Sequence, residues 1–214
     1  MRRFRRAIGR VGSGDVEGSV LKALRIGRKE PHSRVVAHWR SVVGALLPLG
    51  GVSTGNRLTL FKDGDSNFSS MWETIDSASD RVWIQTYTLE PDAVGLKTIQ
   101  CLENAAARGC DVKLLFDSVG SWKIEDRHVQ RLESLGARVI FYNPINFWKF
   151  SFSFLHRNHR KICLVDDKVA FVGGMNISCD YAGPLTGGNS YFADVNVKVE
   201  EKETFFFFFV IFLL

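Results

Sequence analysis

The chain has 214 residues, enough for one well-buried domain with extensions, and its 45% hydrophobic content is typical of a globular protein. Its net charge of +5 is unevenly distributed, because residues 1–40 hold eleven Lys and Arg against three Asp and Glu, whereas the rest of the chain holds 17 against 20. A nuclease usually spreads basic residues over the face that binds the nucleic-acid backbone. The slightly acidic body therefore argues against nucleic acid as a partner.

The N-terminal extension, residues 1–55, begins with five Arg and has no acidic residue before Asp15. Such an Arg-rich start is typical of a mitochondrial presequence, and it also suits a basic arm that binds an anionic membrane surface. The apolar stretch 42–52 is shorter than the roughly 20 residues that a membrane-spanning helix needs, and Pro48 interrupts it. We therefore expect a membrane-associated protein, with a mitochondrial location as one interpretation.

The middle of the chain alternates strand-like and helix-like segments, which predicts an α/β body. Residues 57–61 and 81–89 have the apolar and β-branched composition of strands. A helix is predicted over 65–79, with Asp65 or Ser66 as its cap. It is predicted because four apolar residues recur at helical spacing: Phe68, Met71, Trp72 and Ile75.

The remaining elements continue this alternation. A helix is predicted over 93–108, because its apolar residues share one face and the pattern stops at Gly109. The later segments are predicted, in chain order, to be a strand, a helix and four strands: 111–117, 124–136, 137–143, 161–166, 169–172 and 191–199. We expect the fold class to be α/β, with a mixed β-sheet flanked by helices over residues 56–200.

The most informative stretch follows the spacing H-x-K-x4-D-x6-G-G-x-N from His159 to Asn176. Side chains alternate along a strand, so His159 and Lys161 should project from the same side and meet one phosphate. An imidazole that is largely neutral near pH 7 supplies a nucleophile. Lys161 and Asn176 supply a cation and an amide for the phosphoryl oxygens. This chemistry requires no metal and no cofactor.

This motif is preceded by Arg157-Asn158, and its end lies in the segment FVGGMNIS. With these flanks it resembles the phospholipase D superfamily and, among its members, most resembles the bacterial-type cardiolipin synthases. The similarity runs from about residue 56 to about residue 200, and no second H-x-K-x4-D occurs in the chain. The resemblance implies one phospholipase D-like half-domain that forms a covalent phosphohistidine at His159. A second motif, from a homodimer partner or a missing C-terminal half, would protonate the departing alcohol.

The resemblance also assigns the remaining site residues. Asp166 belongs to the motif and is predicted to support the strand and its loop more than to touch the substrate. Asp194, in SYFADVNVKVE, is predicted to orient the imidazole through its other ring nitrogen. Gly173 and Gly174 are predicted to allow a close approach to the substrate, with an ordinary turn as the alternative.

Aromatic residues crowd the segment before the motif, PINFWKFSFSFLHRN. Trp148 and Phe150 are predicted to contact the phospholipid substrate or the membrane interface, where aromatic side chains partition well. The alternative is a core strand. The four cysteines have no metal-binding or disulfide spacing, so reduced thiols are expected.

Residues 201–214 end in FFFFFVIFLL, a low-complexity apolar run too short to span a bilayer. We expect this tail to reflect a truncated or mispredicted reading frame, with a hydrophobic anchor as the alternative.

The leading functional hypothesis is phosphatidyl transfer of the cardiolipin synthase type from a phosphatidylglycerol-like donor. The alternatives are a dimeric phosphodiesterase, either a phospholipase D or a nuclease, and a catalytically silent membrane-associated fragment.

Overall fold

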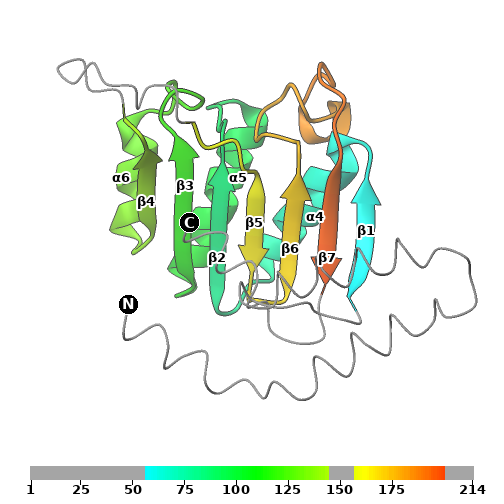
Figure 1. Ribbon diagram of the computed structural model, residues 1–214. Helices are drawn as coiled ribbons and strands as arrows, with labels where there is room; N and C mark the ends of the chain where they lie inside the picture. Colours follow the sequence, from blue (N-terminus) through cyan, green and yellow to red (C-terminus); the bar gives the residue numbers. More distant parts are fainter. Residues whose placement is uncertain (1–55, 145–156, 201–214) are drawn as a thin grey trace, which may run out of the picture. The chain divides into compact units, whose positions relative to one another are not determined.

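The computed structural model describes residues 56–144 and 157–200, and Figure 1 shows that these form a sheet with helices behind it. The predicted lipid-contacting residues Trp148 and Phe150 lie outside the described residues. The basic N-terminal extension and the apolar tail lie outside them as well.

Seven strands form one mixed sheet in the order β1-β7-β6-β5-β2-β3-β4. Three neighbouring strands are parallel: β2 (Arg81–Thr86), β3 (Asp111–Asp117) and β4 (Arg138–Tyr142). The strands on the other side of β2 pair antiparallel with their neighbours: β5 (Ile162–Val165), β6 (Val169–Gly173), β7 (Asn196–Glu200) and β1 (Arg57–Phe61). The predicted α/β class with a mixed sheet is therefore confirmed.

Three helices cover one face of this sheet in Figure 1: α4 (Gly64–Asp76), α5 (Ala93–Ala107) and α6 (Asp126–Ser134). Helix α4 packs on β1 and β5, α5 packs on β2 and β3, and α6 packs on β4. The core between these layers contains large, fully buried side chains, including Phe68, Phe116 and Phe171. Across residues 56–144 and 157–200, no helix is both long and apolar enough to cross a membrane.

Helix α4 starts earlier than predicted and has a different cap. Asp63 is the N-cap, and its side chain accepts a hydrogen bond from the Ser66 N–H at 2.8 Å. The predicted alternatives, Asp65 and Ser66, were wrong because Asp65 has another partner. Its carboxylate accepts hydrogen bonds from the N–H and hydroxyl of Thr186, in the short 3₁₀ helix η3 (Pro184–Thr186).

The sheet brings distant parts of the chain to one edge. Parallel strands β2 and β3 end at the edge where antiparallel β5 begins, and Gln85, the second-to-last residue of β2, pairs with Ile162. The residues after β2, after β3 and before β5 are therefore neighbours. The motif segment is predicted as a strand from 161, but the strand begins at Ile162, so His159 and Lys161 precede it.

Candidate active site

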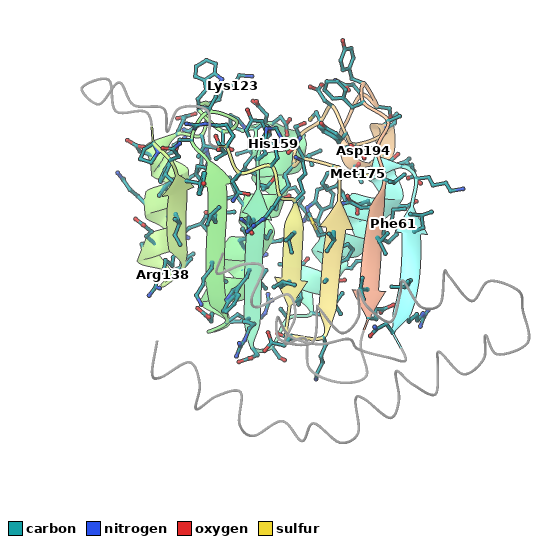
Figure 2. All side chains as sticks on the ribbon, viewed as in Figure 1. Phe61, Lys123, Arg138, His159, Met175 and Asp194 are labelled. Atoms are coloured by element: carbon teal, nitrogen blue, oxygen red, sulfur yellow. The ribbon has the colours of Figure 1, made fainter. Side chains whose placement is uncertain are left out.

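His159 lies at this edge with its imidazole packed on Tyr87. Tyr87 directly follows β2, and the two rings are stacked with centroids 4.0 Å apart and an interplanar angle of 14°. His159 is exposed, and Figure 2 shows it at the upper edge of the sheet, at the opposite end from Arg138. The ring is therefore held on one face by Tyr87 while the residue remains open to solvent.

Lys161 lies beside the same tyrosine. Its Nζ donates a hydrogen bond to the His159 carbonyl oxygen at 2.9 Å and lies 5.6 Å from the centre of the Tyr87 ring. Burial lowers the pKa of Lys161 below its ordinary value, and the negative charge of Asp194 partly opposes this change. The structure thus brings His159, Lys161 and Asp194 to one region of the edge.

Asn176 joins this region through the loop after β6. Its Oδ1 accepts a hydrogen bond from the Thr88 N–H at 3.2 Å, and its Nδ2 donates one to the Tyr181 hydroxyl at 3.0 Å. The side chain is 7% exposed, and an isolated parallel bridge between Leu89 and Ile177 fastens the loop to the segment after β2. Among the described residues, one of its two amide hydrogens is used in a hydrogen bond.

Gly173 and Gly174 pass close to the start of β7. A Cβ atom on Gly173 would lie 2.3 Å from the Val195 carbonyl oxygen, and one on Gly174 would lie 2.0 Å from Oδ1 of Asp194. The Gly174 N–H also donates to the Val195 carbonyl oxygen at 3.0 Å. The prediction gave these glycines a substrate as their close neighbour, whereas the structure gives them residues 194–196 of the same chain.

Asp166 lies at the other end of β5, away from the imidazole. Its carboxylate accepts hydrogen bonds from the backbone N–H groups of Ser79, Asp80 and Arg81 and from the Ser79 hydroxyl. Burial pushes the pKa of Asp166 upward, but the donors, led by Arg81, outweigh it and hold the pKa below its ordinary value. Asp166 therefore supports the fold and does not reach the reacting groups.

Similar proteins identify the family to which this site belongs. A family model described as "Cardiolipin synthase, PLD-like domain" matches residues 71–203, more than half of the chain. The chain belongs to this family. Cardiolipin synthase 1 of Staphylococcus epidermidis is 33% identical to this PLD-like domain over 149 residues, which are 70% of this chain and 30% of that protein. The chain thus spans under a third of the length of that curated relative.

Solved structures share the fold of the PLD-like domain. Phosphatidylserine synthase from Haemophilus influenzae has a TM-score of 0.55 and 18% identity, covering 68% of this chain and 33% of that chain. NucT from Helicobacter pylori has a TM-score of 0.53 and 17% identity, covering 73% of this chain and 89% of that chain. At this level of identity the likeness concerns the arrangement of strands and helices alone.

Within the PLD-like domain, Asp194 has other contacts than the His159 imidazole that was predicted as its partner. Its Oδ1 accepts a hydrogen bond from the neighbouring Val195 N–H at 2.7 Å, and its charge acts on Lys161. Among the described residues no hydrogen bond joins Asp194 to His159. The structure therefore does not support the predicted orientation of His159 by Asp194 of the same chain.

Two residues of the site were missed by the sequence reasoning. Tyr87 contacts the imidazole directly, and Asp117 binds the segment that carries His159. Each had a signal in the sequence, since Tyr87 follows a buried strand and Asp117 places a carboxylate at the end of the apolar strand DVKLLFD. Tyr87 follows β2 and Asp117 ends β3, at the edge where polar groups of a site usually gather.

Proposed function

We propose that this chain is the catalytic half of a phosphatidyltransferase of the cardiolipin synthase type, acting on a phosphatidylglycerol-like phospholipid. One observation carries the proposal: the His159 imidazole and the Lys161 ammonium lie against the same Tyr87 ring at one edge of the sheet. A nucleophile beside a cation is what an anionic phosphodiester requires. The similarity to cardiolipin synthases supports a lipid as the substrate.

In the first step, a ring nitrogen of His159 attacks the phosphorus, and the bond from phosphorus to the departing glycerol oxygen breaks. This oxygen takes a proton from an acid, and the phosphatidyl group remains on the imidazole. In the second step, the hydroxyl of another lipid attacks the phosphorus and loses its proton to the conjugate base of that acid, and the bond from phosphorus to the ring nitrogen breaks. Lys161 and the second amide hydrogen of Asn176 stabilise the phosphoryl oxygens in both steps.

The acid is proposed to come from a second motif. Asp194 and His159 of one chain are not joined among the described residues, which supports a site that another imidazole and another carboxylate complete. A second copy of this chain would supply both in a two-fold dimer, and a C-terminal half would do the same. Because the proposed substrate is a bilayer lipid, we also propose that the enzyme acts at an anionic membrane surface, with a mitochondrial location as a further proposal.

The test compares lipid with nucleic acid as substrate. The full chain is incubated with phosphatidylglycerol vesicles or with single-stranded DNA, and the products are separated by mass spectrometry. We expect phosphatidyl transfer, a trapped phosphoenzyme, and loss of both in His159→Asn. The matched control is His128→Asn, which changes a histidine of α6 and should retain both. Turnover by the His159→Asn variant, or consumption of DNA in place of lipid, contradicts the proposal.

A further inference from the structure

A buried carboxylate behind the site has no role in the steps above. Asp117 is the last residue of β3 and is 0% exposed. A buried carboxylate is strongly destabilising unless it is hydrogen-bonded and paired with a positive charge. Asp117 has both a positively charged partner and a backbone donor. Its Oδ1 accepts from an Arg157 guanidinium nitrogen at 3.2 Å, and its Oδ2 accepts from the Asn158 N–H at 3.1 Å.

The first connection from Asp117 to the site runs through the backbone before the nucleophile. Asn158 immediately precedes His159, and the hydrogen bond from its N–H to Asp117 fixes the peptide group between residues 157 and 158, one residue before the nucleophile. The Asn158 side chain then accepts a hydrogen bond from the Arg160 N–H at 3.2 Å, on the other side of His159. The backbone on both sides of the imidazole is therefore tied to Asn158, and Asn158 is tied to Asp117.

The second connection runs through the turn after β3. Oδ1 of Asp117 accepts hydrogen bonds from the N–H groups of Val119 at 2.9 Å and Gly120 at 3.4 Å. Gly120 lies so close to Tyr87 that a Cβ atom would be 2.3 Å from the Tyr87 carbonyl oxygen. The Ser121 hydroxyl donates to that same oxygen at 3.1 Å. Asp117 thus also holds the residue whose ring supports the imidazole.

We propose that Asp117 is a positioning residue for His159. It fixes the backbone that carries the imidazole through Asn158, and it fixes the ring on which the imidazole rests through the 119–121 turn and Tyr87. The carboxylate does not contact the substrate in this proposal. In-line attack on phosphorus depends on the direction of the attacking nitrogen, and a displacement of about 1 Å lowers the rate about 100-fold.

The first readout measures the imidazole and needs no turnover. In the full chain with ¹³C-labelled histidine, the ring current of Tyr87 should shift the His159 Hε1 resonance upfield. His159→Asn assigns this resonance, and Tyr87→Leu marks its position without the stacked ring. We expect Asp117→Asn to move the resonance toward its Tyr87→Leu position, because an amide nitrogen cannot accept the hydrogen bonds that the lost oxygen accepted.

The second readout is turnover, and it is the part that rests on the proposed function. We expect Asp117→Asn to lower kcat for phosphatidylglycerol by about 100-fold with KM little changed, because orientation of the nucleophile is lost and lipid binding is not. If the wild-type chain alone transfers no lipid, a site completed by a second copy of this chain fails on its own, and the histidine resonance still decides the positioning role.

The matched control is Asp111→Asn at the opposite end of the same strand. Asp111 also holds two side chains, accepting from Trp83 Nε1 at 3.0 Å and pairing with Lys113 at 3.1 Å, and it is distant from the edge that carries His159. This variant should leave the His159 resonance and kcat as in the wild type. A purely general loss of strand stability would affect both variants.

A third variant covers the case in which Asp117→Asn does not fold. Arg157→Gln retains the carboxylate and its backbone donors but removes the cation beside it, so we expect the same changes at smaller size. A folded Asp117→Asn or Arg157→Gln protein whose His159 resonance is unmoved overturns the proposal. A moved resonance with unchanged kcat in an active enzyme also overturns it.

Discussion

Ser79 donates two hydrogen bonds to one oxygen of Asp166, from its backbone N–H at 2.9 Å and from its hydroxyl at 3.0 Å. Asp80 and Arg81 donate their N–H groups to the other oxygen at 2.8 and 2.9 Å. The loop before β2 is therefore fastened to the turn between β5 and β6. The most recognisable acidic residue of the motif serves the fold, at the opposite end of the strand from the nucleophile.

Replacing Asp166 with Asn should lower stability and leave the chemistry intact. We expect a loss of about 1–3 kcal/mol in the free energy of unfolding, because backbone donors lose a charged acceptor. Urea unfolding measures this loss. The control is Asp167→Asn, the next residue, which also has a positive φ but whose ion pair is with Arg81 at 3.1 Å. A lower kcat at unchanged stability contradicts the structural role.

Stability should fall with acidification in a window set by two carboxylates. The Thr186 hydroxyl, ahead of the backbone donors, holds the pKa of Asp65 below its ordinary value, and the pKa of Asp166 is also lowered. Each group is more acidic folded than unfolded, so its stabilisation is complete above about pH 4 and is lost as pH falls through the folded pKa. Urea unfolding midpoints between pH 6 and pH 3 should fall less steeply in Asp166→Asn.

Replacing Asp194 with Asn should lower the pKa of Lys161 further. Burial already disfavours the ammonium, and Asp194 is the charge that opposes this effect. Its removal should therefore shift the titration of the Lys161 side chain to lower pH, as measured by NMR on ¹³Cε-labelled lysine. Asp180→Asn, which removes a partly buried carboxylate that accepts a hydrogen bond from Asn189, is the control. An unchanged Lys161 titration in Asp194→Asn shows that the two charges do not interact.

The two motif glycines should respond differently to Ala. The new Cβ in Gly173→Ala meets the Val195 carbonyl oxygen and the Asn196 Cα, which are backbone atoms that cannot move easily. We expect a loss of about 1–3 kcal/mol from overpacking. The three atoms nearest the Cβ in Gly174→Ala all belong to the Asp194 carboxylate group, which can rotate away, so stability should change less while the Lys161 titration shifts as in Asp194→Asn. Equal losses of stability would contradict this assignment.

If the second motif comes from another copy of the chain, specific activity should depend on protein concentration. A proton donor in another molecule makes the dimer the active species. Activity per mole should therefore rise as the protein concentration increases, and it should level off when dimers predominate. Sedimentation velocity measures the dimer fraction over the same range. Activity that is independent of concentration in a monomeric sample contradicts a site shared between two copies.

The local elements of the fold could be predicted well from the sequence. Strand β3 has the predicted bounds, 111–117, and helix α5 ends within one residue of the predicted end, because apolar periodicity and a terminal glycine are local signals. The last strand was predicted over 191–199 but begins at Asn196. Residues 194–196 approach the glycines of the motif, and that contact cannot be inferred from periodicity.

The candidate site could be predicted only in part, because its supports are distant in sequence. The motif spacing indicated His159 and Lys161, but Tyr87 lies 72 positions before the histidine on which it stacks. Asp117 lies 41 positions before Asn158. The pairing of Asp194 with His159 stays a prediction for a related reason: a resemblance gives the residue type at a position but not the group that the fold places beside it.

One hydrogen bond at the edge has a consequence for how relatives of this domain can diverge. Arg157 donates to the Asn143 carbonyl oxygen at 3.2 Å as well as to Asp117, so the chain leaves β4 and returns to the motif at nearly the same point. Because both ends of this connection are joined through Arg157, it can change in length or sequence without displacing the backbone that carries His159. Relatives of the PLD-like domain can therefore diverge between residues 144 and 157 while the position of His159 is kept.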